Sequence, residues 1–397
     1  MGRAPRIMLY SHDTLGFGHI RRNLLIAETL SQMTPAPEIL MVGGMREAGA
    51  FVLPKGVDCV TLPAYAKGVD GKYQPRDLGT DLDRLADLRS QMIHATTMAF
   101  APDLLIVDNV PRGAQFELDR TLKALSKQGR TRIVLGLRDV IDRPQNVRRQ
   151  WLRQRNFETV RRYFDAVWIY GDPAFYDLLS DCGMENAFGT ASIYTGYLDP
   201  AARRGTPQAI MERTTVLGDD TRPYVFCAVG GGRDGAALAE SFARARLPDG
   251  HRGILVTGSQ MPAEQQARIA KFTSNRTDMT VLPFLREPID LMAGASRIVG
   301  MGGYNTTCEI LSLGRPSLIV PRVAPREEQL IRTSRLAADG AVSMIHPDRL
   351  TPDRLSAWLA DPQPVPATGQ PDMRGLTKVR ALAEDLVHFP TNMERAS

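Results

Sequence analysis

The sequence predicts an α/β fold built from two doubly wound domains. Apolar strand-like runs alternate with helical patterns along most of the chain, several of these runs are continuously apolar, and a polar segment divides the chain into two halves of similar size. Continuous apolar runs are typical of parallel strands that helices cover on both faces. The repetition of strand, helix and strand therefore indicates two Rossmann-like domains.

The expected strands form two groups, one on each side of the polar segment. They lie at 7–10, 38–42, 59–62, 104–107, 132–137 and 166–169, and then at 224–229, 253–257, 279–282, 297–300 and 317–320.

The polar segment runs from Asp199 to Pro223 and is rich in proline and glycine, as domain linkers tend to be. We therefore expect a first domain at residues 1–200, a linker at 201–222 and a second domain at 223–374. A last helix, within 375–397, is expected to pack back on the first domain.

Composition indicates an ordinary globular protein without a membrane span. Of the 397 residues, 43% are hydrophobic and 23% are charged, and no apolar run approaches the roughly 20 residues that a bilayer requires. The N-terminus leads straight into a strand, without the apolar region of a signal peptide. The four cysteines are far apart in the sequence, so we expect buried thiols rather than a disulfide or metal framework, and a cytoplasmic location. They are Cys59, Cys182, Cys227 and Cys308.

The net charge is +5, and much of the excess lies in one stretch between residues 143 and 162. Apolar residues, among them Trp151, alternate with the arginines there. Such a helix could rest on anionic lipid or hold a phosphorylated acceptor. We favour a solvated basic face with Trp151 packed in the core. Nucleic-acid binding is not expected, because no stacking motif or recognition module accompanies the charge. The arginines are Arg143, Arg148, Arg149, Arg153, Arg155, Arg161 and Arg162.

Three glycine-rich turns follow apolar strands, at residues 11–18, 230–235 and 300–303. After the first turn, the spacing of Ile20, Leu24, Ala27 and Leu30 predicts a helix with one apolar face, and after the third, residues 305–307 offer caps for a helix start. Glycine lets the backbone approach a ligand closely, and a helix start favours phosphate through its N–H groups and dipole. Neither the dinucleotide fingerprint nor the ending of a P-loop is present. Each turn alone could serve packing, but their recurrence favours a nucleotide-sugar site at the carboxyl ends of the strands.

These turns resemble those of the GT-B glycosyltransferases, in which two Rossmann-like domains face each other across a cleft. The second half is most similar to the family-28, MurG-like group, over residues 225–236, 282–292, 299–321 and 326–341. The first half matches mainly through Gly16-Phe17-Gly18-His19. The resemblance implies an inverting, metal-independent glycosyltransferase that uses a nucleotide-diphosphate sugar, with a UDP-sugar expected, and no cofactor. The acceptor would be a hydroxyl on a lipid-linked or small molecule, and contact with the inner face of the membrane is a further expectation.

The resemblance also implies roles for residues of the donor domain. Gly231, Gly232 and the amides near Gly235 would lie at the diphosphate, backbone groups at Leu285 would contact the base, Gly302, Gly303 and Thr306 would line the pocket, Glu309 would hold the ribose, and Gln329 would contact the sugar. Two departures leave the donor's identity open: Arg233-Asp234 lengthens the mid-chain turn, and Glu328 stands where a glutamine is common.

Transfer with inversion needs a base that takes the proton from the acceptor hydroxyl, and histidine suits that task. His19, on the acceptor-side loop with Gly16 and Gly18, is our leading candidate. Asp108 could orient its ring, and Asp13 is the rival base. The structural alternatives are that His19 and Asp108 only cap helices.

Positive charge for the leaving diphosphate could come from Arg233 or Arg322 together with helix starts. The Asp81-Leu82-Asp83 run resembles a metal motif, but it lies in a charged helical pattern, and we interpret it as a solvated helix face. We therefore expect no metal site.

Three alternatives remain open. The run from Gly16 to Arg22 also resembles a nucleotide-sugar hydrolase, in which water replaces the acceptor; the segments 65–80 and 109–115 could line an acceptor cleft, which favours transfer. A UDP-sugar 2-epimerase of the same architecture should show a second histidine at the site, and the sequence does not identify one. A non-catalytic nucleotide-sugar-binding protein would have no turnover to lose in His19→Ala.

Overall fold

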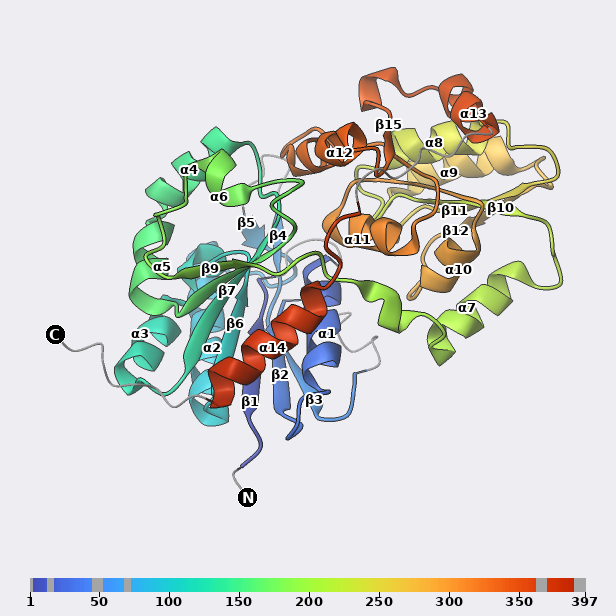
Figure 1. Cartoon of the computed structure of the whole chain (residues 1–397). Helices are drawn as coiled ribbons and strands as arrows, with labels where there is room; N and C mark the ends of the chain where they lie inside the picture. Colours follow the sequence, from blue (N-terminus) through green and yellow to red (C-terminus); the bar gives the residue numbers. More distant parts are fainter. Residues whose placement is uncertain (1–2, 13–17, 45–52, 68–72, 362–369, 389–397) are drawn as a thin grey trace. The chain divides into compact units, whose positions relative to one another are not determined.

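The computed structural model describes residues 3–12, 18–44, 53–67, 73–361 and 370–388 (Figure 1). The chain forms two compact units. Unit 1 comprises residues 1–173, 177–198 and 374–397, and unit 2 comprises residues 174–176 and 199–373.

Unit 1 is built on a parallel seven-stranded sheet with the strand order β3-β2-β1-β6-β7-β8-β9. β1 pairs with β2 on one side and with β6 on the other, so the order of the chain reverses between β1 and β6. This is the switch point at which open α/β sheets bind ligands. The strands are β1 (Arg6–Tyr10), β2 (Glu38–Gly43), β3 (Val57–Thr61), β6 (Leu104–Asp108), β7 (Arg132–Arg138), β8 (Ala166–Tyr170) and β9 (Ala191–Tyr194).

The helices of unit 1 pack their apolar faces on this sheet. In α1, the predicted spacing of Ile20, Leu24, Ala27 and Leu30 forms the buried face. The helices are α1 (Gly18–Leu30), α2 (Leu82–Phe100), η2 (Ala114–Phe116), α3 (Asp119–Gln128), α4 (Pro144–Arg153), α5 (Asn156–Tyr163), α6 (Leu178–Cys182) and α14 (Gly375–His388).

The C-terminal helix α14 belongs to unit 1 and packs beside α1 (Figure 1). It begins at Gly375, where a Cβ atom would lie 2.5 Å from the carbonyl oxygens of Gly196 and Tyr197. Only glycine allows the two backbones to come this close.

Unit 2 repeats the architecture with a parallel six-stranded sheet in the order β12-β11-β10-β13-β14-β15, whose switch point lies between β10 and β13. Its strands are β10 (Tyr224–Ala228), β11 (Arg252–Val256), β12 (Met279–Leu282), β13 (Arg297–Gly300), β14 (Ser317–Ile319) and β15 (Ser343–Met344). Its helices are η3 (Pro200–Arg203), α7 (Pro207–Leu217), α8 (Ala236–Arg244), α9 (Ala263–Thr273), α10 (Ile289–Gly294), α11 (Tyr304–Leu313), α12 (Glu328–Ala338), η4 (Pro347–Arg349) and α13 (Pro352–Ala360).

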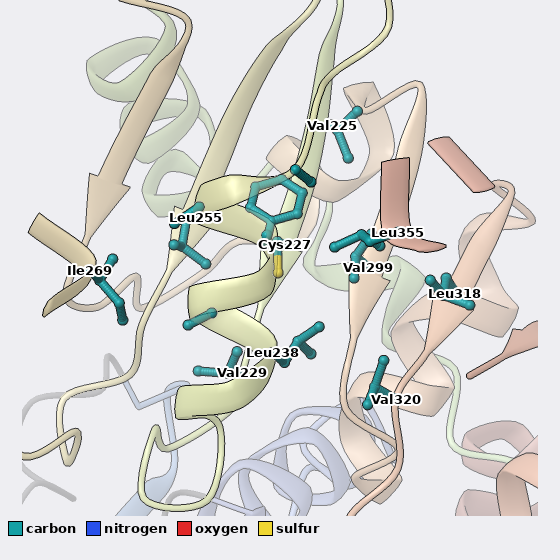
Figure 2. Close-up of a cluster of buried hydrophobic side chains, with 14 of the residues drawn as sticks. Val225, Cys227, Val229, Leu238, Leu255, Ile269, Val299, Leu318, Val320 and Leu355 are labelled. Atoms are coloured by element: carbon teal, nitrogen blue, oxygen red, sulfur yellow. The ribbon is translucent and has the colours of Figure 1, made fainter. Parts of the chain in front are cut away.

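One face of this second sheet is covered by a core that Figure 2 shows. Val225, Cys227 and Val299 project from neighbouring strands against Leu238 of α8 and Leu355 of α13. Burial raises the pKa of the Cys227 thiol, as expected for an inert core cysteine. In the part of the chain that the structure describes, Cys59, Cys182 and Cys308 are likewise thiols and not halves of a disulfide.

Every expected strand is present, and the described residues form four further strands that were not expected. β4 (Tyr65–Lys67) and β5 (Tyr73–Pro75) form an antiparallel hairpin inside the segment 65–80, while β9 and β15 are short edge strands.

Residues 201–222, predicted as a linker, carry most of η3 and all of α7 and are part of unit 2. The Thr206 side chain caps α7 by accepting a hydrogen bond from the Ala209 amide, and Pro207 occupies the first turn. This local capping signal favours a helix over a linker.

The arginines of α4 and α5 form the solvated face that the sequence favoured. Arg148, Arg149 and Arg153 are exposed, whereas Trp151 is buried against the rings of Phe157 and Phe188. Within the described ranges, no helix has both the length and the apolar character to cross a bilayer.

Candidate active site

The predicted catalytic pair lies at the switch point of unit 1. His19 is the second residue of α1 and Asp108 is the last residue of β6, and His19 Nδ1 is hydrogen-bonded to Asp108 Oδ2. The His19 side chain is 18% exposed and the Asp108 side chain only 2%, so the imidazole is accessible while its partner is not. An ionised carboxylate only accepts hydrogen bonds. Nδ1 therefore carries the ring proton, and Nε2 is left as the basic nitrogen.

Arg22 is a third member of this cluster, and its role was missed at the sequence level. Its Nε lies 3.0 Å from Asp108 Oδ1, and its Nη2 lies 2.7 Å and 2.6 Å from the two carboxylate oxygens. Burial alone would raise the pKa of Asp108, but the charges of Arg22 and His19 outweigh it and hold that pKa well below the usual range. Asp108 is thus an anion at neutral pH, and it fixes the His19 ring.

A second histidine packs against this group. The rings of His12 and His19 meet edge to face, with centroids 4.6 Å apart and planes at 62°. His12 is 7% exposed and lies two residues beyond β1. Because β1 and β6 are neighbours in the sheet, residues that follow the two strands share one edge.

The remaining acceptor-side predictions are Gly18, Asp13 and Gly16. Gly18 opens α1, and among the residues that the structure describes, no atom would lie within 4 Å of a Cβ atom there. Asp13 and Gly16 lie outside the described residues.

The predicted donor residues gather at the switch point of unit 2, at the carboxyl ends of β10 and β13. Gly231 is open, since the nearest atom to a Cβ there would be Gln260 Oε1 at 3.7 Å. Gly232 is different: its φ is +92°, and a Cβ would lie 2.3 Å from the Thr257 carbonyl oxygen. Gly258, missed by sequence reasoning, mirrors this contact from the loop after β11, with its Cβ position 2.4 Å from the Gly231 carbonyl carbon. Gly232 and Gly258 are therefore explained by two loops that pack backbone to backbone.

The turn after β13 combines a packed glycine with an open one. A Cβ at Gly302 would lie 2.6 Å from Thr333 Oγ1 of α12, and the buried Arg332 donates a hydrogen bond of 2.9 Å to the Gly302 carbonyl. Gly303 has open space around its Cβ position and is the N-cap of α11, without a side-chain cap. The helix begins at Tyr304, so the caps expected from the residues at 305–307 do not form; these residues lie in the first turn. The start of a helix favours an anionic ligand through its N–H groups and its dipole.

Of the other predicted donor residues, two lie on the helix that follows this turn, and Leu285 follows β12 at the edge of the sheet. Thr306 lies in the first turn of α11 and Glu309 is buried in the next. The Leu285 side chain belongs to the core, and the loop that follows it is held by Glu212, whose carboxylate accepts from the amides of Arg286 and Glu287 at 2.9 Å each.

Arg322 joins Gln329 to the mid-chain turn. Its backbone N–H donates to Gln329 Oε1 at 3.0 Å, and its guanidinium contacts Asp234 at 3.1 Å and is hydrogen-bonded to Glu328. Burial would lower the pKa of Arg322, but Glu328 and Asp234 together raise it. These two carboxylates already neutralise Arg322, so it is a poorer source of charge for a diphosphate than the exposed Arg233.

The Asp81–Asp83 run lies at the start of a helix, and both aspartates are exposed, as expected for the predicted solvated helix face. Asp81 is the N-cap of α2 and accepts a hydrogen bond of 2.7 Å from the Arg84 amide. The described parts of the chain hold no group of three or more His, Cys, Asp or Glu side chains that could ligate a metal ion.

Known proteins resemble the second half in sequence. The model of the "Glycosyltransferase family 28 C-terminal domain" matches residues 229–386. The predicted resemblance to family 28 is confirmed. The UDP-N-acetylglucosamine–N-acetylmuramyl-(pentapeptide) pyrophosphoryl-undecaprenol N-acetylglucosamine transferase of Agrobacterium fabrum is 26% identical over 219 residues, 50% of this chain and 55% of that protein. The corresponding protein of Methylorubrum extorquens is 29% identical over 206 residues, 45% and 55% of the two chains. The chain thus spans about half the length of the curated relatives that it matches.

Solved structures share the fold of the whole chain. MurG of Acinetobacter baumannii has a TM-score of 0.54 and 15% identity over 96% of this chain and 95% of its own. The glycosyltransferase of kitacinnamycin has a TM-score of 0.57 and 15% identity over 97% and 95%. A Listeria monocytogenes protein assigned as a UDP-N-acetylglucosamine 2-epimerase reaches 0.60 at 11% identity over 97% and 98%. The predicted GT-B fold class is therefore confirmed, and identities this low show the fold alone.

Proposed function

We propose that this protein is an inverting glycosyltransferase that moves a sugar from a nucleotide diphosphate, with UDP as the expected nucleotide, to a hydroxyl acceptor. The observation that carries the proposal is the His19–Asp108–Arg22 cluster at the switch point of unit 1, in a chain whose second half matches family 28. The curated relatives, which transfer N-acetylglucosamine from a UDP-sugar by name, support this reaction class.

In the proposed reaction, His19 Nε2 takes the proton from the acceptor hydroxyl. The acceptor oxygen attacks the anomeric carbon from the face opposite the diphosphate and forms the new glycosidic bond. The bond from that carbon to the diphosphate oxygen breaks, and its electron pair leaves with the nucleotide. Asp108 stabilises the imidazolium that forms, and Arg22 keeps Asp108 ionised.

The donor would bind in unit 2. We expect its diphosphate at Gly231, Arg233 and the start of α11, its ribose at Glu309, its base at the backbone of Leu285, and its sugar near Thr306 and Gln329. We also expect transfer to proceed without a metal ion, so turnover in excess EDTA should equal turnover with added Mg²⁺.

A lipid surface is a proposed partner as well, with the acceptor lipid-linked. The observation that favours it is Leu152, which is 60% exposed on α4 between exposed arginines. Arginines near an anionic membrane contribute about 1 kcal/mol each. Replacing Arg148, Arg149 and Arg153 with glutamine should lower retention on phosphatidylglycerol vesicles by roughly 100-fold, whereas Arg268→Gln in unit 2 should not. Equal retention of all three proteins would remove this part of the proposal.

The test of the function is a thermal-shift panel of UDP, dTDP, GDP and their sugar conjugates, followed by product analysis with the best ligand. A ligand that binds only the folded state raises the melting temperature. We expect a UDP-sugar to give the largest shift and to be consumed slowly even without acceptor. If no nucleotide shifts the transition, the proposal fails.

The second candidate is a UDP-sugar 2-epimerase, which the packing of His12 on His19 favours. Product analysis separates the two reactions, because an epimerase returns an isomeric nucleotide sugar instead of free nucleotide. His12→Phe keeps a ring against His19; it should retain transfer if His12 only packs, and abolish epimerisation if His12 exchanges a proton.

A further inference from the structure

The loop after β12, residues 283–288, is held by a carboxylate of α7. Glu212 is 9% exposed, and each of its two oxygens accepts a hydrogen bond of 2.9 Å from a backbone amide, one from Arg286 and one from Glu287. Gln208, one turn earlier on α7, donates to Glu212 Oε1 at 2.8 Å. Glu212 therefore clamps two consecutive peptide groups of this loop to α7.

Two further carboxylates join the same elements. Arg203 of η3 pairs with Glu287 at 2.7 Å, and neither side chain is more than 10% exposed. Asp290, in the first turn of α10, accepts a hydrogen bond of 3.1 Å from the Gly205 amide. α10 begins directly after the loop, and α7 packs beside it (Figure 1). The loop and the start of α10 are thus held to η3 and α7 at several points.

The clamp by Glu212 sets the direction of a backbone carbonyl. The peptide bonds of this loop are trans, and in a trans peptide group the N–H and the C=O point in opposite directions. Because the Arg286 amide points at Glu212, the Leu285 carbonyl of the same peptide group points away from it. The bond from the Glu287 amide turns the Arg286 carbonyl in the same way.

Holding these two amides explains why residue 212 carries a charge although it is buried. Burying an ionised carboxylate costs free energy, which its hydrogen bonds offset. An apolar side chain could fill the same space without that cost. It could not accept from the two amides, and the direction of the Leu285 carbonyl would then be less well defined.

A carbonyl of fixed direction distinguishes between the two pyrimidines, uracil and cytosine. A carbonyl oxygen accepts hydrogen bonds and cannot donate them. Uracil has an N–H group at ring position 3, which donates, whereas the nitrogen of cytosine at that position carries no hydrogen and accepts. The Leu285 carbonyl can therefore pair with uracil but not with this nitrogen of cytosine. A site built for a hydrogen bond rejects an analogue that cannot make it.

We propose that Glu212 is a positioning residue for the nucleotide base: it directs the Leu285 carbonyl toward the base and thereby selects uracil over cytosine. The inference rests on the proposed function, in which the base binds at the backbone of Leu285, and it names the side chain on which the choice of nucleotide depends. Glu212 does not touch the donor itself and acts only through the loop.

The test is isothermal titration calorimetry of UDP and CDP with the wild type, Glu212→Ala and Glu212→Gln. We expect the wild type to bind UDP about 100-fold more tightly than CDP. In Glu212→Ala this ratio should fall below about 10, because UDP binds more weakly while CDP binds as before. Glutamine keeps one accepting oxygen but turns an NH₂ group toward the other amide, so Glu212→Gln should give an intermediate ratio.

Thr206→Ala is the matched control on the same helix. It removes the side-chain cap of α7 and so lowers the melting temperature, but it leaves the contacts of Glu212 in place. The ratio of the UDP and CDP affinities should therefore stay at the wild-type value in Thr206→Ala. If Glu212 served stability alone, the ratio would change in both variants or in neither.

An unchanged ratio in Glu212→Ala, or an equal fall in Thr206→Ala, would overturn the positioning role and leave the proposed function standing. Equal affinities of the wild type for UDP and CDP would do the same. If neither these nucleotides nor those of the thermal-shift panel bound the wild type, the proposed function would fail and the positioning role with it.

Discussion

The candidate residues of the two units lie at equivalent switch points, but different interactions hold them in place. In unit 2 the predicted donor residues are mainly glycines, and the constraint is backbone packing, as where Gly232 meets the loop of Gly258. In unit 1 the constraint is buried charge, in the pairs Arg22–Asp108 and Arg89–Glu117. Under the proposed function, the main-chain scaffold of unit 2 would hold the diphosphate, and the side chains of unit 1 would carry out the proton transfer.

The largest expected effect is on the buried charge of unit 1. Arg89→Met leaves Glu117 charged and unpaired in the core, so the free energy of unfolding should fall by about 3–5 kcal/mol. Arg89→Lys should also destabilise, because lysine cannot make both bonds. Urea denaturation measures the loss, and the exposed pair Arg155–Glu158 supplies the control, since Arg155→Met should cost less than about 1 kcal/mol. Equal losses in the two variants would contradict the role assigned to buried charge.

The backbone constraint of unit 2 predicts the next effect. Gly232→Ala adds a Cβ that would lie 2.3 Å from a carbonyl oxygen at a positive φ, so stability should fall by about 2–4 kcal/mol. Gly230→Ala shares the positive φ but has open space, and should cost only about 1–2 kcal/mol. If Gly230→Ala lowered the stability more than Gly232→Ala, close packing of the two loops would not explain why residue 232 is a glycine.

The buried charge of Asp108 also predicts how the free energy of unfolding depends on pH. Because its native pKa lies well below the usual range, its ionisation contributes stability that is present above about pH 4 and is lost as the pH falls toward the native pKa. Because Asp108 also stabilises a positive charge on His19, the stability difference between the wild type and Asp108→Asn is compared only below pH 5. It should shrink by about 1 kcal/mol by pH 3, measured by urea denaturation at each pH. A difference that grew on acidification would mean that Asp108 is protonated in the native protein.

The smallest effect on stability is expected at Gly303, where a methyl group meets open space. Gly303→Ala should change the free energy of unfolding by less than about 1 kcal/mol, while lowering the affinity for the UDP-sugar, because the methyl would project at the start of α11. Isothermal titration calorimetry gives the affinity. Gly302→Ala is the matched control: it should destabilise more, through its contact with Thr333. If Gly303→Ala bound the UDP-sugar with the affinity of the wild type, the start of α11 would not be the phosphate site.

The sequence predicted the parts of this molecule that local patterns determine. Continuous apolar runs identified the central strands of both sheets, and the spacing of Ile20, Leu24 and Ala27 identified the buried face of α1. The short edge strands β9 and β15 were missed because they are too brief and too half-buried to show a period. Thr206 and Pro207 form a typical helix start and could have predicted α7, but the proline- and glycine-rich composition of the segment favoured a linker.

Side-chain partnerships were harder to predict, because they join residues far apart in the chain. Arg22 and Asp108 are separated by 86 positions, and Arg89 and Glu117 by 28. From the sequence alone, an arginine within an amphipathic helix is expected to be solvated. Only the arrangement of the sheet shows that a carboxylate lies beside it. Gln115 and Phe116 have φ angles of 51° and 61°. The sequence did not predict this left-handed backbone, since neither residue type favours that region.

The most direct test of the central proposal compares donor binding with donor consumption in the wild type and His19→Ala. If unit 2 binds the donor and His19 is the base, calorimetry with the UDP-sugar should give the same affinity for both proteins. Nucleotide release, measured with a hydroxyl acceptor that supports turnover by the wild type, should fall by about 10²- to 10⁴-fold in the variant. Equal release by the two proteins would contradict the assignment of His19 as the base.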